Sequence, residues 1–488
     1  MTKANHITQQ STLIQTRDWT RRRFLQTAVA GTAVAGAGLP VFAGASAPKI
    51  VVVGAGLAGL NAAWQLKKAG LHADVYEATG RTGGRVFTLE NAVGPRLTSD
   101  LGGSFIDSIH TEMLTLAQEL KVELLDYEDD EETLADTVNF FGGTKYTDEQ
   151  KMEALQPFLP RIGEDYRKAR SNPQEAGRLD RLPTSEYMTW IGMEGWIRDC
   201  MEVLFKMEMG LECEEQSALV FISQLAPDSE GNTMMFDLHD ERYLIKGGAQ
   251  RLPDALAAQL DGQIHVHHAL EAVHPAGSGF VLSFSSSSGA PKEVKADIAV
   301  LTVPFSVLRH TDLRVELPPL KKQAIAELGY GTNAKIIAGF RARLWRKQGY
   351  YGDVLTDLPF QSLWDSTPFQ PGPAGALTFL FGGRAGFELI EGFNPNMAML
   401  NDLEPVFPGL SKAHNGRYAL WNWPTWTFSR GSYSCYKPGQ QTTLAYAAGR
   451  PVGNLYFAGE HCSTEFNGFM NGAAETGHRV ADAIIASL

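Results

Sequence analysis

A continuous apolar run early in the chain is followed by a stretch in which apolar residues recur at helical spacing. The run covers 50–53, the helical spacing covers 57–68, and the next candidate strand covers 72–76. A continuous apolar run is typical of a strand that is buried on both faces. The pattern therefore predicts a strand, a helix and a second strand of a parallel sheet.

The hydrophobic pattern changes farther along the chain. Residues 111–239 carry apolar side chains at helical spacing and predict a largely helical region, within which the acidic run 127–132 predicts a solvated loop. Residues 330–430 alternate short, aromatic-rich β runs with Pro and Gly turns. Between these two regions the alternation predicts strands at 265–273, 280–284 and 298–303, with a Ser-rich hairpin at 283–289.

Three glycines follow the first predicted strand with the spacing of a dinucleotide-binding turn. In this G-x-G-x-x-G run, Gly54 makes the tight turn, Gly56 lets backbone approach a pyrophosphate, and Gly59 lets the helix pack on the strand. Glu77 ends the second strand, 23 residues after Gly54, where an acid can hold a ribose hydroxyl. The unit predicts a dinucleotide whose phosphates lie at the helix N-terminus.

A second turn of glycines and arginines specifies which dinucleotide is bound. Residues 80–85 read Gly-Arg-Thr-Gly-Gly-Arg, and Arg81 and Arg85 can fork onto phosphate oxygens. With Gly84, this turn resembles the extended FAD fingerprint of the flavin amine oxidase superfamily. The resemblance implies FAD rather than a nicotinamide dinucleotide.

Length and charge narrow the class of protein. The chain has 488 residues, which is too long for one core and predicts two domains. The formal net charge of −12 argues against a nucleic-acid partner, and solubility alone explains it.

The first 47 residues are predicted to be an export signal rather than part of the fold. Residues 20–26 match the twin-arginine pattern, a mild apolar stretch covers 28–41, and small residues offer cleavage at Ala43, Ala45 or Ala47. The stretch is too short and too weakly apolar to serve as a stable membrane anchor. We expect the twin-arginine (Tat) machinery as a partner and a periplasmic or secreted location. This route carries folded proteins, so a cofactor could be loaded before export.

The cysteines and histidines predict no metal site. The spacings of the four cysteines match no metal-binding pattern, and the histidines are scattered. We expect buried thiols at Cys200, Cys213, Cys435 and Cys462.

A segment that begins at Asp100 resembles a turn that lies against the flavin ring in amine and polyamine oxidases. The run Asp-Leu-Gly-Gly-Ser looks like their acid-x-Gly-Gly turn. Glycine lets backbone come close to a flat aromatic ring. The resemblance implies that Gly102, Gly103 and Ser104 contact the cofactor.

The end of the chain reads as a strand, a loop and a terminal helix. The resemblance implies that Gly459 and Glu460 lie at the cofactor, with Glu460 binding a ribityl hydroxyl. It also implies that Gly468, Phe469 and Met470 approach the flavin, and glycine is suited to such a close approach.

Lys335 is the candidate for proton handling. It lies among Ala and Ile residues at the entry to an apolar strand, where a solvated charge is unexpected. Its position resembles that of the superfamily lysine that holds a water at flavin N5. A lysine in an apolar site has a lowered pKa and can handle protons. A strand-end lysine whose ammonium reaches solvent is the alternative.

Residues 421–436 hold six aromatic side chains and contain Arg-Gly-Ser-Tyr-Ser. This run resembles the matching segment of polyamine oxidases and flavin histone demethylases. The resemblance makes Tyr433 and Phe469 the two aromatic walls of an apolar slot for an amine. Mitochondrial-type monoamine oxidases have, at the position of Ser432, a Cys that bonds the flavin. Serine cannot form that thioether, so we expect non-covalent FAD.

The resemblance to the flavin monoamine oxidase and polyamine oxidase family covers nearly all residues after 48. It implies an α/β fold with a Rossmann-like FAD-binding domain built from discontinuous segments and an α+β substrate-binding domain. The implied segments of the FAD-binding domain are 48–110, 240–315 and 435–488, and those of the substrate-binding domain are 111–239 and 316–434.

The function implied is an FAD-dependent amine oxidase that turns a primary or secondary amine into an imine and reduces O2 to H2O2. Lys335, Tyr433 and Phe469 are its implied catalytic residues. The alternatives are an L-amino acid oxidase with Arg96 as the carboxylate clamp, a flavin dehydrogenase with another electron acceptor, a non-catalytic flavoprotein and a lipid desaturase. The individual amine and the oligomeric state, with a homodimer as one option, stay open.

Overall fold

The computed structural model describes residues 47–488 except 131–133, 136, 230, 287–288, 290 and 390–397. The chain divides into two units, 1–47 and 48–488, and the description below concerns the second. The predicted export signal thus lies outside the described residues, apart from Ala47. No helix in the described part of the chain has the length and apolar character that a membrane crossing requires.

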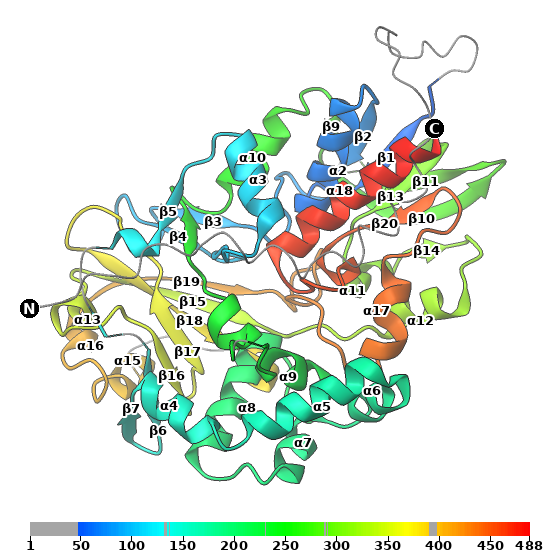
Figure 1. The fold of residues 1–488 in the computed structure, drawn as a ribbon. Coiled ribbons are helices and arrows are strands. Elements are labelled where there is room, and N and C mark those ends of the chain that lie inside the picture. Colours follow the sequence, from blue (N-terminus) through cyan, green and yellow to red (C-terminus); the bar gives the residue numbers. More distant parts are fainter. Residues whose placement is uncertain are drawn as a thin grey trace, which may run out of the picture. The chain divides into compact units, whose positions relative to one another are not determined.

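A five-stranded parallel sheet carries the predicted nucleotide unit. The order β20-β13-β1-β2-β9 places the first strand of the chain at the centre and the last strand at an edge (Figure 1). The strand, helix and strand predicted from the first apolar runs are confirmed as β1, α2 (Leu57–Lys68) and β2. The five strands are β1 (Ile50–Val53), β2 (Ala73–Tyr76), β9 (Ile264–His265), β13 (Ile298–Leu301) and β20 (Leu455–Phe457).

Both faces of this sheet are covered, which explains the continuous apolar run. Ile50 and Val52 of β1 pack in a core with the helices on one face, whereas Val51 and Val53 pack in a second core with an antiparallel sheet. That sheet has the order β12-β11-β10-β14. The helices are α2, α3 (Thr111–Glu119), α10 (Arg251–Ala258) and α18 (Met470–Ser487), and the strands are β10 (His268–Ala276), β11 (Gly279–Ser286), β12 (Lys292–Ala296) and β14 (Asp312–Leu313).

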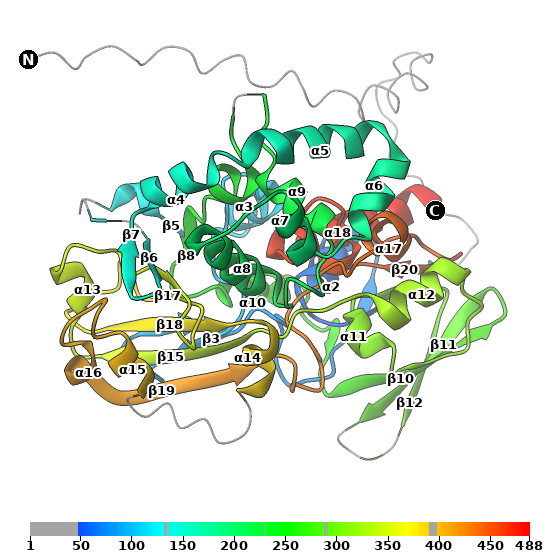
Figure 2. The same ribbon diagram turned by 90° about the horizontal axis from the view of Figure 1, so that it is seen from below.

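A seven-stranded sheet forms the second half of this unit, with the order β19-β15-β18-β17-β16-β6-β7. Strand β15, the second in this order, is buried along its whole length and pairs antiparallel with both neighbours. Figure 2 shows its long strands lying apart from the β10–β12 sheet. The strands are β6 (Val138–Phe141), β7 (Thr144–Tyr146), β15 (Ala334–Phe340), β16 (Val354–Thr356), β17 (Ser362–Asp365), β18 (Gly375–Phe381) and β19 (His414–Asn422).

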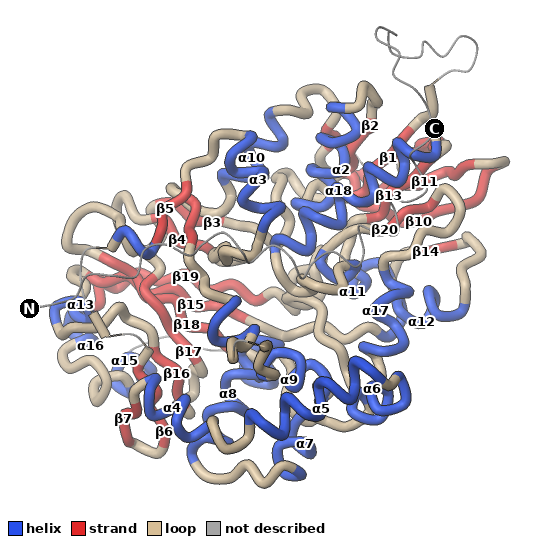
Figure 3. Tube along the Cα trace, viewed as in Figure 1, coloured by secondary structure: helices blue, strands red, loops and turns tan. Residues whose placement is uncertain are grey.

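Helices between β7 and β8 cover this sheet, as the blue group in Figure 3 shows. Their core includes Phe205 of α8 and Phe221 of α9, together with Leu355 and Leu380 from the sheet. The largely helical region predicted over 111–239 is confirmed for the part after 147. The helices are α4 (Asp148–Leu155), α5 (Leu159–Ser171), α6 (Pro173–Asp180), α7 (Thr184–Trp190), α8 (Trp196–Met209) and α9 (Ala218–Leu225).

The remaining elements are short. Two small antiparallel pairs, β3 with β4 and β5 with β8, connect the larger layers. The strands are β3 (Thr88–Glu90), β4 (Thr98–Asp100), β5 (Leu124–Asp126) and β8 (Tyr243–Ile245). The helices are η1 (Tyr127–Asp129), η2 (Met234–Leu238), α11 (Phe305–Leu308), α12 (Pro319–Glu327), α13 (Leu344–Lys347), α14 (Gly383–Glu388), α15 (Ala398–Asp402), α16 (Leu410–Ala413), α17 (Gln441–Ala448) and η3 (Glu460–Cys462).

Two local predictions were wrong or incomplete. The acidic run at 127–132 is exposed at Glu128 and Asp129, as predicted, but it begins as the short helix η1, and Tyr127 lines an internal cavity. Residues 131–132 lie outside the described residues. The strands β6 and β7 within the helical region were missed because both are short and join the sheet through the pairing of β6 with the distant strand β16. The four cysteines are free and buried, as expected. The boundaries between the two predicted domains stay a prediction.

Candidate active site

A cavity of about 1190 Å³ connects the nucleotide turn after β1 with side chains of α8 and of the seven-stranded sheet. Pockets for drug-sized ligands usually measure about 300–1,000 Å³. This cavity therefore has room for a dinucleotide together with a small substrate.

The glycines after β1 leave the space that a pyrophosphate needs. A Cβ on Gly56 would have no atom within 4 Å, although Gly56 lines the cavity, and Gly54 takes a φ of +105°. Gly59 does not line the cavity. A Cβ there would lie 2.0 Å from the Gly54 carbonyl oxygen, so Gly59 serves the packing of the helix on the strand, as predicted.

Glu77 is held in place at the end of β2. Its carboxylate accepts hydrogen bonds from the Ala55 N–H at 2.9 Å and from the Thr79 N–H at 2.8 Å. Its side chain lines the same cavity as Gly56. The geometry suits an acid that accepts from a ribose hydroxyl.

The two arginines of the second turn have different places. Arg81 does not line the cavity: its guanidinium donates to the carbonyls of Thr82, Gly84 and Val86, which shapes the turn. We expected the Arg81 guanidinium to bind phosphate oxygens, but it instead stabilises the conformation of its own turn. Arg85 does line the cavity and donates to Glu460 at 2.7 Å.

Glu460 is the best-satisfied acid of the cavity. Besides Arg85, it accepts from the Ser434 hydroxyl at 2.6 Å and from the Gly468 N–H at 2.8 Å. Burial acts to raise its pKa, but Arg85 and these donors hold the pKa of Glu460 below its usual value. It is thus a buried anion that fixes Gly459, Gly468 and the 432–434 segment around the cofactor space.

Lys335 lies on β15, where the cavity meets the acid-x-Gly-Gly turn. Its Nζ donates to the Gly102 carbonyl at 2.7 Å, and lies 5.0 Å from the centre of the Trp364 ring. Burial lowers the pKa of Lys335 to about 8 against the opposing charges of Asp100 and Glu241. The lysine is 8 % exposed, so the alternative in which its ammonium reaches bulk solvent is excluded.

The turn itself brings backbone close to the cavity. Gly102, Gly103 and Ser104 all line it. A Cβ on Gly103 would lie 2.8 Å from the Met470 side chain, which also lines the cavity. Asp100 is anchored by the Thr88 hydroxyl and the Ala249 N–H, and burial raises its pKa to about 6.

The two predicted aromatic walls are both present in the cavity lining. The Tyr433 hydroxyl donates to the Met207 carbonyl at 3.2 Å, which fixes that ring against α8. The Phe469 ring stacks on His239, with 4.6 Å between ring centres and 16° between planes. The slot is therefore less apolar than expected, because an imidazole lies behind one of its walls.

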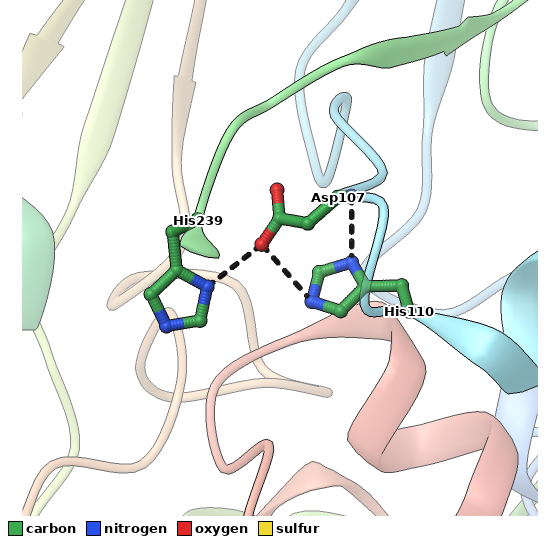
Figure 4. Close-up of side chains that lie close together, drawn as sticks. All are labelled: Asp107, His110 and His239. Atoms are coloured by element: carbon green, nitrogen blue, oxygen red, sulfur yellow. Dashed lines mark hydrogen bonds and ion pairs between the residues drawn. The ribbon is translucent and has the colours of Figure 1, made fainter. Parts of the chain in front are cut away.

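An aspartate holds this imidazole in place (Figure 4). His239 Nδ1 and the Asp107 carboxylate are 2.7 Å apart, and the Glu241 N–H donates to the same carboxylate at 3.1 Å. His110 Nε2 lies 3.2 Å from it. Asp107, His110 and His239 thus cluster within reach of a metal ion.

The hydrogen bonding of this cluster argues against a metal ion. The Asp107 N–H points at His110 Nδ1 at 3.0 Å, so Nδ1 accepts and the proton of the neutral ring is on Nε2. A protonated Nε2 has no lone pair for a metal. Burial lowers the pKa of His110 to about 4, which keeps the ring neutral.

Two cavity acids were missed in the sequence, Glu208 on α8 and Glu241 after η2. Neither carboxyl has a hydrogen bond or ion pair within the described residues. The signals were present: Glu208 continues the apolar helical stripe of Met201 and Phe205, and Glu241 stands in a His-Asp-Glu-Arg run. A charged residue in an apolar stripe is a functional candidate.

Arg96, the clamp that an amino acid oxidase would need, lies elsewhere. It is exposed in the turn between β3 and β4 and does not line the cavity. The cavity does contain Arg242, but this side chain pairs with Asp126 and Glu128. The position of Arg96 therefore does not support its proposed role as the clamp for a substrate carboxylate.

Known proteins resemble this chain over most of its length. The family model described as flavin containing amine oxidoreductase matches residues 57–485. A flavin-containing amine oxidase of Oncorhynchus mykiss is 24% identical, with 89% of this chain and 85% of that protein covered. A putative L-amino-acid oxidase of Bacillus subtilis is 28% identical, with 88% and 93% covered. Cyclohexylamine oxidase from Brevibacterium oxydans has the same fold, with a TM-score of 0.79 at 22% identity and coverage of 91% and 99%.

Proposed function

Because this chain belongs to the family of flavin-containing amine oxidoreductases, whose cofactor is FAD, we propose that it oxidises a primary or secondary amine with O2 as electron acceptor. Membership confirms the predicted α/β fold class, the FAD cofactor and the oxidation of amines. The class of amine, the acceptor and the roles of single residues are our proposal.

The chain's residues fit the cofactor that the family implies. Gly54 and Gly56 would receive its pyrophosphate, because a Cβ on Gly56 would point into the open cavity. Glu77 would bind its ribose, and Gly102 and Gly103 would lie against its ring system. When bound, FAD supplies the two-electron acceptor of the reaction.

The protein's own groups prepare the amine. An ammonium has no free electron pair, so the substrate must lose a proton before its α C–H bond can be broken by hydride loss. The buried slot between Tyr433 and Phe469 disfavours the cation and admits the neutral amine. Lys335, with a pKa of about 8, can hold or release a proton at Nζ near neutral pH.

One observation carries this proposal: a buried lysine donates to the Gly102 carbonyl within the cavity that Gly56 and Glu77 also line. A protein that only stored a flavin would have no need for a buried, proton-exchanging group there. The imine that forms is hydrolysed by water to an aldehyde or ketone.

An anaerobic screen tests the proposal directly. Amines are mixed with the yellow protein and the flavin absorbance near 450 nm is followed, after which air is admitted. We expect bleaching by at least one class of amine and recovery of the colour in air, with H2O2 formed. A flavin that no amine bleaches would contradict the proposed activity. Bleaching without recovery in air would favour a dehydrogenase with another acceptor.

The attachment of FAD is tested separately. Ser432 is buried and its hydroxyl donates to the Asn333 side chain at 2.6 Å, an arrangement that offers no thiol to the flavin. After precipitation with acid we expect the yellow colour in the supernatant. A yellow pellet would show a covalent bond and contradict the prediction.

Export and assembly are further parts of the proposal. The twin-arginine pattern at 20–26 supports export of the folded, FAD-loaded protein to the periplasm or the medium. Replacing Arg21 and Arg22 with Lys is expected to leave the protein inside the cell, and fractionation checks this. Sedimentation of the mature protein decides between a monomer and the homodimer left open by the sequence.

A further inference from the structure

Glu208 and Glu241 are two acids of the cavity that the proposed reaction does not use. Both line the cavity. Neither carboxyl makes a hydrogen bond or an ion pair with any residue in the described part of the chain. Buried or enclosed acids are normally paired, so two unpaired ones in a ligand cavity call for an explanation.

Each acid adjoins one aromatic wall of the slot. Glu208 follows Met207, whose carbonyl accepts the Tyr433 hydroxyl at 3.2 Å. The backbone of Glu241 is held by Asp107, and the same carboxylate holds His239, which stacks on Phe469 at 4.6 Å. The two carboxyls thus come from segments that hold the two walls, and they are near enough to influence each other's charge.

The local charges do not balance without a ligand. Burial raises the pKa of Glu208 to about 7. Burial and the nearby Glu208, Asp107 and Asp353 raise the pKa of Glu241 well above its usual value, and Lys335 opposes this only in part. Such a group of acids has a deficit of positive charge, which a bound cation would correct.

The amine that is oxidised cannot be this cation. A carboxylate beside the reacting nitrogen would hold its proton and so preserve the unreactive ammonium. The acids therefore suit a nitrogen that stays protonated throughout the reaction. His239 lines the same cavity, and its Nε2 has no hydrogen-bond partner in the described residues. An ammonium has three N–H donors, so one ligand nitrogen can satisfy more than one acceptor.

We propose that Glu208 and Glu241, with His239 beside them, bind a second, non-reacting ammonium, so that the preferred substrate is an amine with two basic nitrogens. This inference rests on the proposed amine oxidation. It assigns the two acids a role in specificity and leaves the removal of the hydride to the rest of the site.

The natural protein provides the first test. Anaerobic flavin reduction is measured with α,ω-diaminoalkanes of three to eight carbons and with n-alkylamines of the same lengths. Because a hydrogen bond to a charged group contributes about 1.5–3 kcal/mol, we expect the best diamine to exceed its matched monoamine by about tenfold to hundredfold in the second-order rate constant. The difference should lie in the apparent Kd rather than in the limiting rate.

Variants of the two acids test whether these residues cause the preference for diamines over monoamines. Glu208→Gln and Glu241→Gln are each expected to reduce the ratio of diamine to monoamine by about tenfold, and the double variant to bring it close to one. Asp240→Asn is the matched control: it removes one charge from the same loop, but Asp240 already accepts from the Ser108 N–H at 2.9 Å. This control should keep the ratio of the natural protein. Loss of an unpaired acid should not lower the melting temperature, so melting curves identify a misfolded variant.

The outcomes separate this inference from the proposed function. Equal efficiency of diamines and monoamines in the natural protein overturns the inference and leaves amine oxidation intact. A diamine preference that survives in the folded double variant also overturns it. Reduction by no amine contradicts the proposed function itself. Because the comparison in the natural protein requires no substitution, the inference stays testable even if both glutamine variants fail to fold.

Discussion

The two ends of the cavity treat their acids in opposite ways. At the cofactor end, Glu77 and Glu460 accept two or more hydrogen bonds each, and Arg85 keeps the pKa of Glu460 below its usual value. At the substrate end, Glu208 and Glu241 have no such donors in the described residues, and their pKa values are raised. The first arrangement stabilises the protein before any ligand binds. The second leaves acids without partners, which costs free energy of folding until a ligand pairs with them.

The largest expected effect concerns the cofactor end. Arg85→Met leaves Glu460 buried beside a neutral side chain, and breaking such a pair costs about 3–5 kcal/mol of unfolding free energy. We expect a lower denaturation midpoint and loss of FAD during gel filtration. The double variant Arg85→Met/Glu460→Gln should recover part of this loss, because no charge is left unpaired. If the losses of unfolding free energy in the two single variants simply add up in the double variant, the Arg85–Glu460 pair is not what stabilises this end.

Lys335→Met is expected to have the next largest effect. It removes the proton-handling group while keeping a side chain of similar length, so we expect the rate of amine oxidation to fall by about 10²-fold. Stopped-flow measurements of flavin reduction and of reoxidation in air show which half-reaction is affected. Lys321→Met is the control, since this buried lysine donates to the Ala448 carbonyl and does not line the cavity. An unchanged rate in Lys335→Met would exclude the role given to Lys335.

The acids at the two ends should contribute to the free energy of unfolding with opposite dependence on pH. The folded pKa of Glu208 is about 7 against an ordinary value of 4.5, so its stability cost develops as the pH rises from about 4.5 to 7. Glu208→Gln should remove a cost of about 1–3 kcal/mol at pH 8 and little at pH 4.5. The pKa of Glu460 is lowered, so its contribution is present above 4.5 and is lost as the pH falls below that value.

Melting curves between pH 4 and 8 check this contrast. The difference between the natural protein and Glu208→Gln should grow toward pH 8, whereas Glu460→Gln should be most harmful at neutral pH and least harmful in acid. Parallel curves for all three proteins would show that neither acid has a shifted pKa in the folded state.

The smallest expected effect is at Arg96. Because this side chain is exposed and outside the cavity, Arg96→Gln should change the kcat/KM for amines by less than about twofold, as is usual for surface substitutions. Comparison of an amino acid with its decarboxylated amine completes the test. A strong preference for the amino acid that is lost in Arg96→Gln would restore the amino acid oxidase alternative.

Local patterns predicted the cofactor end better than the substrate end. Gly54, Gly56 and Glu77 lie within one continuous unit, so spacing alone specified their geometry. The substrate end is assembled from α8, the segment after η2 and the terminal helix, which are distant in sequence. Chain spacing cannot show that Glu208 and Glu241 share one cavity, although Glu208 interrupts an apolar helical stripe. The role of Arg81 was also misread, because its donors are taken by carbonyls of its own turn.

The place of the last helix has a consequence for synthesis of the chain. Helix α18 lies alongside α2, and the Asn61 side chain donates to the Ala474 carbonyl, 413 residues later (Figure 1). Strand β20, at the edge of the parallel sheet, is likewise synthesised long after β1. The dinucleotide unit therefore cannot close until β20 and α18 have left the ribosome. A chain truncated near residue 450 would expose the Ile50 and Val52 face of β1 and would be recognised by quality-control proteases rather than accumulate as a partly active product.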